Sequence, residues 1–352
     1  MIPTLQKGWA ILRSDTVTLP TDEMYDAMRA APLGDDNRQE DPTTLELEAM
    51  AAQMLGKESA IFLLSGTMGN LVGVMCQTQH GQEIILGSNA HMFNSEQGSY
   101  AAIGGLSAAL VPTRYGYMEP AAIERAIRPT KDVHTPLTGL LCLENTHNAA
   151  GGVALTAEQM RAMSVVARQK GVPVHVDGAR IFNAAVALGV PAKELVQDAD
   201  TVTFCLSKGL SCPAGALLVG PREKIERARR IRKGLGGTLR QSGVLAAAGI
   251  VALKCMVNRL PEDHARARRL ADGLSAIPRL QIDPLRTQTN MVFVDVSQLT
   301  TAREFHQRLL KHQVEVLVAG PVEMRLVTHR HITDTEVDQT VDAFRRVVAD
   351  FK

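Results

Sequence analysis

Two side chains at the ends of predicted strands can together carry a chemistry that neither supports alone. Asp177 follows an apolar stretch at residues 172–176, and Lys208 follows a second one at residues 201–206. Because α/β proteins bind ligands at the carboxyl ends of parallel strands, both side chains are expected at one edge of a sheet. Pyridoxal phosphate uses such a pair: a lysine amine holds it as a Schiff base, and a carboxylate keeps its ring nitrogen protonated so that the ring accepts electrons.

Each of these residues also has an ordinary structural interpretation. Asp177 alone could cap the helix that follows it, and an isolated Lys208 would usually be solvated surface. The cofactor interpretation requires a third part, a phosphate site. The stretch "LLSGTMGN" supplies one, because Gly66 and Thr67 open a helix whose backbone N–H groups and a hydroxyl can bind phosphate. Small residues at a strand-to-helix turn are also common packing devices, and the absence of a Walker lysine or a GxGxxG pattern disfavours nucleotide binding.

The elements that must position these side chains alternate between helical and strand patterns from about residue 43 to residue 219. Helical spacing of apolar residues is expected over residues 42–56, 67–81 and 156–171. Each stretch ends at a glycine, and Thr156 is expected to cap the start of the third. Short apolar stretches typical of strands are "AIFLLS", "QEIILGS", "TGLLCLENT", "VPVHVDG", "TVTFCLS" and "AGALLVG". Strands separated by helices predict a mainly parallel sheet that is covered on both faces.

A second unit is expected after a long helical stretch at residues 239–260. Its patterns are a helix at 263–274, a strand at 289–296, a helix at 301–313, a strand at 323–329 and a closing helix at 333–351. The expected organisation is an N-terminal segment plus a large cofactor-binding domain at residues 1–245, and a small α+β domain at residues 246–352.

Composition removes several classes of partner and favours a small molecule. Lys plus Arg number 38 and Asp plus Glu 37, so a net charge of +1 gives no electrostatic reason for a nucleic-acid or membrane partner. The basic run at residues 227–233 is expected to be a solvated helix face, because aromatic residues make up only 4% of the chain. We expect no bilayer-spanning run, and the five scattered cysteines suit reduced thiols in a cytoplasmic protein.

The order of several short motifs is similar to that of the L-threonine and L-allo-threonine aldolases, which belong to the aspartate-aminotransferase-like (fold type I) class of pyridoxal-phosphate enzymes. The motifs run from about residue 11 to residue 330 and are "LRSDTVTLPTDEM", "GDD" with "EDPT", "SGTMGN", "ENTHN", "HVDGARIFNA", "CLSKGL" and "RLVTH". The resemblance implies that α/β fold with a smaller α+β C-terminal domain, and pyridoxal 5'-phosphate as cofactor. It also implies reversible cleavage of β-hydroxy-α-amino acids to glycine and an aldehyde.

The resemblance also implies which residues hold the cofactor. Lys208 would carry it and Asp177 would face its ring nitrogen. Gly66 and Thr67 would bind its phosphate, and His91 in "SNAHMFNSEQG" would stack on its ring. Without the resemblance, His91 would be interpreted as a histidine satisfied by its own loop.

Other family positions concern the substrate and neighbouring subunits. Ser14 and Arg325 match the binders of the substrate carboxylate, and Arg180 lies close enough in the pattern to share that task. A guanidinium suits a carboxylate because it donates two parallel hydrogen bonds. Lys233 and Arg240 match positions that approach the active site, and the cofactor, from a neighbouring subunit. The family implies a homotetramer with active sites at subunit interfaces.

The group that removes the β-hydroxyl proton stays open from sequence. His91 and His134 both match family histidines near the substrate, and a histidine is the natural first candidate because its pKa lies near the working pH. An ordered water is a third candidate. His329 and His331 are discounted as a metal site, because two histidines on one strand lack a carboxylate partner. No metal is expected.

One departure from the family pattern concerns substrate preference. Between "GDD" and "EDPT" the family usually carries a tyrosine followed by a glycine, whereas this chain carries Arg38 and Gln39. If this segment borders the substrate, a cation replaces an aromatic hydroxyl there. We therefore expect Arg38 to change the selectivity between threonine diastereomers or for larger β-substituents.

Two other functions are compatible with the same residues. Lys208 and Asp177 are common to other pyridoxal-phosphate lyases and to aminotransferases on this fold, because a fold does not dictate a reaction. A non-catalytic binding protein on the same fold is the alternative from another class. The stretches "RSDTVT" and "HMFNSEQG" favour the aldolase.

Overall fold

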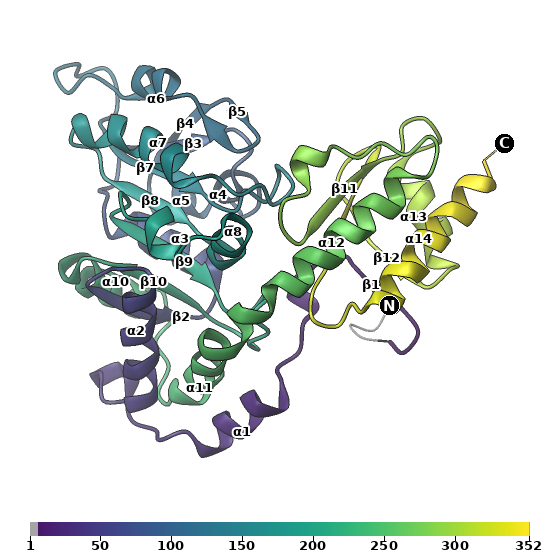
Figure 1. Ribbon diagram of the computed structural model, residues 1–352. Helices are drawn as coiled ribbons and strands as arrows, with labels where there is room; N and C mark the ends of the chain where they lie inside the picture. The colour runs from purple at the N-terminus through teal and green to yellow at the C-terminus, as the bar shows by residue number, and fades with distance from the viewer. Residues whose placement is uncertain (1–5, 352) are drawn as a thin grey trace. The chain divides into compact units, whose positions relative to one another are not determined.

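The computed structural model describes residues 6–351, and its contacts divide them into two units (Figure 1). The large unit comprises residues 19–150 and 154–257, and the small unit comprises residues up to 18, 151–153 and those from 258 onward. This division differs from the expected boundary after residue 245. Strand β1 (Ala10–Ile11) pairs in parallel with β12 (Val314–Glu315), so backbone hydrogen bonds tie the N-terminal segment to the small unit.

A seven-stranded sheet organises the large unit. In spatial order its strands are β2 (Ser59–Leu63), β10 (Ala216–Gly220), β9 (Thr201–Cys205), β8 (Val174–Asp177), β7 (Thr138–Glu144), β3 (Glu83–Gly87) and β4 (Ser107–Val111). Strand β10 runs opposite to the other six, which confirms the mainly parallel sheet. The central strands are buried almost throughout, as parallel strands with both faces covered must be.

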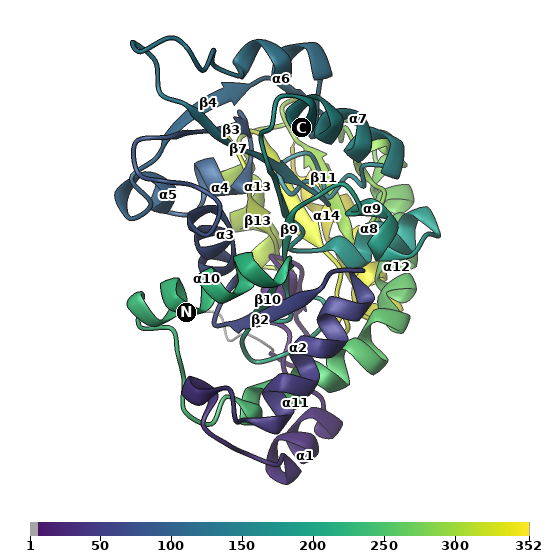
Figure 2. The same ribbon diagram turned by 90° about the vertical axis from the view of Figure 1, so that its left-hand side faces the viewer.

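Helices cover both faces of this sheet. Figure 2 shows α3 (Gly66–Met75) and α10 (Arg222–Gly234) on one side and α7 (Ala157–Gln169) and α8 (Ile181–Leu188) on the other. The expected cap at Thr156 is present, because its side chain accepts from the N–H of Gln159 and the Gln159 side chain accepts from the N–H of Thr156. Other helices are α1 (Asp22–Ala30), α2 (Pro42–Met54), α4 (His91–Asn94), α5 (Ser99–Ala102), α6 (Pro120–Ala126), α9 (Ala192–Leu195) and α11 (Gly243–Val251).

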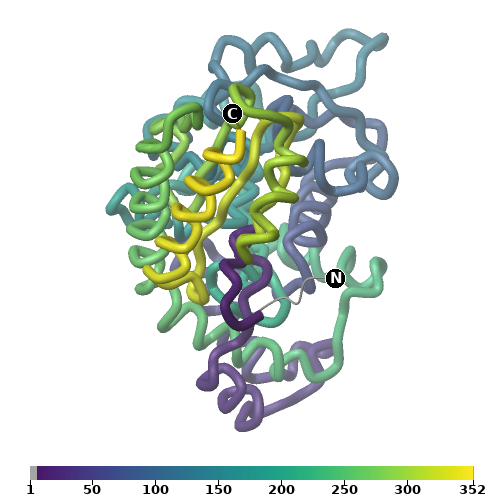
Figure 3. Tube along the Cα trace, turned by 90° about the vertical axis from the view of Figure 1, so that its right-hand side faces the viewer, coloured from purple at the N-terminus to yellow at the C-terminus, as the bar shows by residue number. Residues whose placement is uncertain are grey.

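The small unit is an antiparallel sheet packed with helices. Strands β11 (Met291–Asp295), β14 (Glu323–Val327) and β13 (Leu317–Val318) form the sheet, and α12 (Leu260–Ser275), α13 (Ala302–Leu310) and α14 (Asp334–Ala349) accompany it. Figure 3 shows α12 and α14 side by side. Phe305 and Phe344 are fully buried in its core, 5.3 Å apart between ring centroids. This is the expected small α+β domain.

The helical stretch Gly243–Ser275 differs from the expectation that no run could cross a bilayer. An 18-residue window in it has a mean hydropathy of 1.5, so the stretch is long and apolar enough by length and composition alone. Half of that window is buried inside the protein, as in the core helices of water-soluble proteins, which pass the same measure.

Candidate active site

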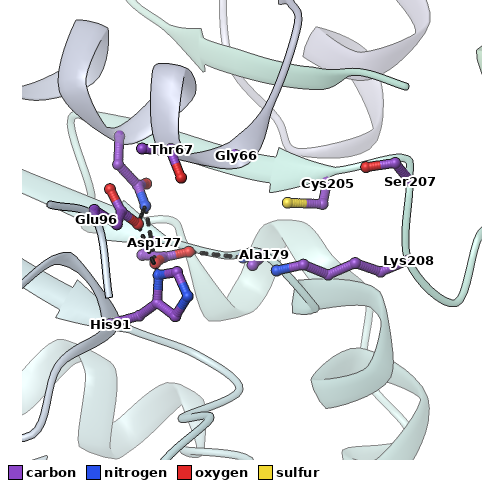
Figure 4. Close-up of a pocket in the computed structure, with 10 residues that line it drawn as sticks. Gly66, Thr67, His91, Glu96, Asp177, Ala179, Cys205, Ser207 and Lys208 are labelled. Atoms are coloured by element: carbon purple, nitrogen blue, oxygen red, sulfur yellow. Dashed lines mark hydrogen bonds and ion pairs between the residues drawn. The ribbon is translucent and has the colours of Figure 1, made fainter. Parts of the chain in front are cut away.

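A cavity of about 130 Å³ in the large unit collects side chains from β8, β9 and α3. Its lining residues are Gly66, Thr67, Asn70, His91, Glu96, Asp177, Ala179, Cys205, Ser207 and Lys208 (Figure 4). The structure therefore brings together five residues that the sequence placed in the cofactor site: Lys208, Asp177, Gly66, Thr67 and His91. The cavity lies where β8 and β9 end, as expected for a mainly parallel sheet.

Asp177 is the last residue of β8 and is only 2% exposed. Its Oδ2 accepts a hydrogen bond from Asn70 Nδ2 at 2.9 Å, and its Oδ1 accepts one from the backbone N–H of Ala179 at 3.0 Å. Helix α8 begins later, at Ile181, so Asp177 is not the helix cap that it could have been on local preferences. Both carboxylate oxygens are held by donors, which fixes the orientation of the group.

Lys208 follows β9 and is half-buried. Figure 4 shows its side chain extended toward Ala179 and Asp177. Burial raises the pKa of the neighbouring Cys205 thiol, and the positive charges of Lys208 and Arg180 oppose that rise. Arg180 is buried at the start of α8, so its charge acts near this cavity although its side chain is not among the lining groups.

The N-terminus of α3 forms the anion-binding side of the cavity. Ser65 caps this ten-residue helix, because its side chain accepts from the N–H of Met68 at 3.2 Å. A Cβ on Gly66 would lie 2.6 Å from Cys205 Sγ, so the close approach of helix and strand requires glycine there. Thr67 is exposed in the first turn of α3, and the first turn of a helix offers backbone N–H groups that can bind phosphate.

His91 is held by two buried carboxylates that the sequence interpretation missed. Its Nδ1 lies 2.8 Å from Glu96 Oε1, and its backbone N–H donates to Glu144 Oε2 at 2.7 Å. The Glu96 side chain is 2% exposed and the His91 ring 30%. The hydrogen bond to Glu96 raises the pKa of His91, and burial raises the pKa of Glu96. The pair therefore retains a proton between these two atoms.

Asn70 joins the two carboxylates of the cavity. Its Nδ2 donates to Glu96 Oε1 and to Asp177 Oδ2, each at 2.9 Å. His91, Glu96 and Asp177 have ligand atoms within 4.8 Å of one another, a spacing that could suit a cation. A metal would have to displace both the Asn70 amide and the proton shared with His91, so this arrangement suits hydrogen bonding better.

Besides Arg180, four sequence-predicted residues of the large unit lie outside the cavity lining. His134 is exposed in the loop before β7, where its backbone N–H donates to Asp132 at 2.9 Å. Arg38 and Lys233 are exposed as well. Arg240 is also exposed and has an ion pair with Asp35 at 3.7 Å.

Ser14 and Arg325 belong to the small unit, which holds them close to each other. Arg325 on β14 donates from Nη2 to the carbonyl oxygen of Arg13 at 3.2 Å, next to Ser14 in the chain. Ser14 Oγ accepts from the N–H of Thr16 at 3.2 Å and caps a short 3-10 helix. The guanidinium of Arg325 therefore contacts the backbone next to Ser14, although the two segments lie far apart in the sequence.

Comparisons of the sequence and of the structure with known proteins agree with one another, and the matched residues lie in both units. The beta-eliminating lyase family matches residues 12–297. Low-specificity L-threonine aldolase 1 of Arabidopsis thaliana is 42% identical over 342 residues, 96% of each chain. Low specificity L-threonine aldolase of Escherichia coli (strain K12) is 42% identical over 339 residues, 96% of this chain and 99% of the relative. The solved threonine aldolase of Leishmania major has a TM-score of 0.83 at 18% identity, covering 96% of this chain and 99% of that one.

Proposed function

The chain belongs to the beta-eliminating lyase family and to the low-specificity L-threonine aldolases, and from that premise we propose that it cleaves L-threonine and L-allo-threonine to glycine and acetaldehyde. The enzyme is a carbon–carbon lyase on the aspartate-aminotransferase-like fold, fold type I, and its cofactor is pyridoxal phosphate. The observation that carries the proposal is a single cavity lined by Lys208, Asp177 and the N-terminus of α3.

The donor set of the cavity fits pyridoxal phosphate. Lys208 supplies the amine and Asp177 the carboxylate, while Gly66 and Thr67 supply the phosphate site. When bound, the cofactor supplies an electron-accepting ring that takes up the charge left on the α-carbon of the amino acid as its bond to the β-carbon breaks. We propose that Asp177, whose two carboxylate oxygens each accept a hydrogen bond, would hold a proton on the ring nitrogen.

The remaining residues orient the substrate and exchange a proton with it. We propose that Arg325 and Ser14 bind the α-carboxylate, with Arg180 as a further positive charge, because this hold decides which bond on the α-carbon is aligned for cleavage. His91 is the base that we prefer. Its Nδ1 is engaged with Glu96, so Nε2 is the ring nitrogen that can take a proton from the β-hydroxyl. His134 lines no part of the cavity.

The first test is aldehyde release from L-threonine and L-allo-threonine, side by side, with pyridoxal phosphate supplied. We expect release from both substrates, and at least a thousandfold loss, on the order of a missing nucleophile, in Lys208→Ala. Release that survives this substitution would contradict the assignment of Lys208.

The same assay separates the two histidines. We expect His91→Asn to lower the rate by roughly a hundredfold or more and His134→Phe to leave it within about threefold. Retained cleavage in both variants would make an ordered water the better base.

We further propose a homotetramer and a cytoplasmic location. In support of the first, Tyr25, Leu33 and Leu45 are each more than two-fifths exposed in residues 19–45, where a subunit interface would cover apolar surface. In support of the second, all five cysteines are free thiols and four are buried.

A further inference from the structure

A row of side chains connects the surface of the large unit to Asp177. We call this row the polar chain; from the surface inward its members are Lys224, Gln77, Thr201, His175 and Asn70. At the outer end, Lys224 Nζ lies 2.6 Å from Gln77 Oε1, and Gln77 Nε2 lies 2.6 Å from Thr201 Oγ1. In the middle, Thr201 Oγ1 lies 2.8 Å from His175 Nδ1, and His175 Nε2 lies 3.3 Å from Asn70 Oδ1. At the inner end, Asn70 Nδ2 lies 2.9 Å from Asp177 Oδ2. Thr201, His175 and Asn70 are at most 2% exposed.

The inner end of the polar chain fixes the direction of its hydrogen bonds. Asn70 faces two carboxylates, Asp177 and Glu96, so its NH₂ group must point at them and both of its hydrogens are used. Its Oδ1 can only accept, and the partner at that oxygen is His175 Nε2. His175 Nε2 therefore carries a proton.

The protonation of His175 also fixes the direction of its hydrogen bond with Thr201. The ring is fully buried, and burial lowers its pKa to about 4, so it is neutral and carries one proton. With that proton on Nε2, Nδ1 must accept, and its partner among residues 6–351 is the Thr201 hydroxyl. Gly73 leaves room for the ring, since a Cβ on it would lie 2.5 Å from His175 Cε1. The tautomer thus follows from the contacts on both sides of the ring.

The outer end gives the same direction independently. Lys224 has only hydrogens to donate, so the oxygen of the Gln77 amide must face it. The Gln77 nitrogen then donates to Thr201 Oγ1 and to the carbonyl oxygen of Gly73 at 3.0 Å. Lys224 is held at its own end by Asp200 at 3.3 Å. Every hydrogen bond from Lys224 to Asp177 therefore points the same way, with the positive group at one end and the carboxylate at the other.

We propose that the polar chain positions the carboxylate of Asp177 and stabilises its negative charge for the ring nitrogen of the cofactor. Aligned hydrogen bonds polarise one another, so a donor at the surface strengthens the last bond to the buried carboxylate. Its members are positioning residues, because they act on the ring nitrogen through Asp177; Asn70 lines the cavity, and the other four do not. The proposal rests on the proposed function for the identity of that cofactor, but the direction of the polar chain does not depend on it.

The test removes the middle link. Thr201→Val deletes the hydroxyl that joins Gln77 to His175, and Thr201→Ser restores one. Thr203→Val is the matched control, because Thr203 lies buried on the same strand and its hydroxyl makes no hydrogen bond. The affinity for pyridoxal phosphate is measured in the full-length protein, and NMR of ¹⁵N-labelled histidine reports which nitrogen of His175 carries the proton before the cofactor is added.

We expect the Nε2–H tautomer of His175 in the wild type and roughly three- to tenfold weaker cofactor binding in Thr201→Val, the size of one buried hydrogen bond. Thr203→Val and Thr201→Ser should stay within about twofold of the wild type. An Nδ1–H tautomer, or equal affinities of Thr201→Val and Thr203→Val, would overturn the proposal.

A substitution nearer the surface tests the same proposal if the buried variant Thr201→Val fails to fold. Lys224→Met removes the charged origin of the polar chain, and we expect weaker cofactor binding in the same direction as in Thr201→Val; an unchanged affinity would overturn the proposal. A wild type that shows the Nε2–H tautomer but binds no pyridoxal phosphate would count against the proposed function and against the cofactor role of Asp177, while leaving the direction of the polar chain intact.

Discussion

The hydrogen bond to Glu96 raises the pKa of His91, and the two residues show how much of the cavity depends on side chains outside the recognised motifs. The Glu96 carboxylate is buried, contacts the ring at Nδ1, and shares the Asn70 amide with Asp177. A histidine with its proton held at Nδ1 exchanges protons with a ligand through Nε2. Glu96 therefore belongs to the machinery of the site.

Glu96→Gln should lower the pKa of His91. In the wild type the hydrogen bond to Glu96 raises this pKa above its ordinary 6.5, so protonated His91 stabilises the fold below that pH, and the contribution is lost as the pH rises through the raised pKa. The stability difference between wild type and variant should then shrink as the pH rises. Histidine NMR titration and urea midpoints at several pH values measure both effects.

A matched control for this comparison is Glu223→Gln, an exposed carboxylate on α10. It should leave the His91 titration unchanged. If Glu96→Gln also leaves it unchanged, Glu96 does not set the charge of His91.

At the residue scale, site residues at the ends of strands could be predicted from the sequence. Residues of other elements that contact them, such as Asn70 and Glu96, could not. Lys208 and Asp177 could be recognised because each ends an apolar stretch. Asn70 contacts Asp177 from 107 positions away, and such a contact leaves no periodic signal. His134 and Arg38 were expected near the substrate by motif position, yet both are exposed outside the cavity lining.

At the element scale, Asp41 ties three segments of the large unit together. It is fully buried at the start of α2, where Oδ1 accepts from the N–H of Thr44 at 2.9 Å. Its Oδ2 accepts from the N–H groups of Gly34 and Gly243, each at 3.1 Å. One carboxylate thus caps α2 and satisfies the first residue of α11.

Asp41→Ala should destabilise the protein by about 2 to 3 kcal/mol, because it removes a cap and leaves the buried N–H of Gly243 and the part-buried N–H of Gly34 without this acceptor. Urea unfolding gives the free energy. Thr301→Ala removes the exposed cap of α13 and should cost about 1 kcal/mol or less. Equal losses in the two variants would show that Asp41 is only an ordinary cap.

The elements themselves were largely predictable, and the exceptions have physical reasons. Apolar stretches marked the buried strands β2, β3, β7, β8, β9 and β10 because each is covered on both faces. The edge strand β4 went unrecognised although four of its five residues are apolar, because it lies at the sheet edge and most of its residues are at least partly exposed, unlike those of the other strands. The N-terminal strand β1 was assigned to the large domain because its partner, β12, lies some 300 residues away in sequence.

At the scale of the whole molecule, the homotetramer that we propose would have a defined mass in solution. Sedimentation should give four subunits for the wild type, and Leu33→Asp should shift it toward smaller species, because Leu33 is exposed in the single chain and the proposed interface would cover it. Leu285→Asp, at an exposed leucine of the small unit, is the matched control and should keep four subunits. A fully active monomeric wild type would contradict this account.

The identity of the products formed from L-threonine tests directly whether the enzyme breaks the bond between the α- and β-carbons. A carbon–carbon lyase releases glycine and acetaldehyde in equal amounts, because the bond between the α- and β-carbons breaks. A lyase that eliminates at the β-carbon would instead lose the hydroxyl group as water and yield 2-oxobutanoate and ammonia. We expect equimolar glycine and acetaldehyde from the wild type and neither product from Lys208→Ala. Formation of 2-oxobutanoate and ammonia without glycine would contradict the aldolase reaction.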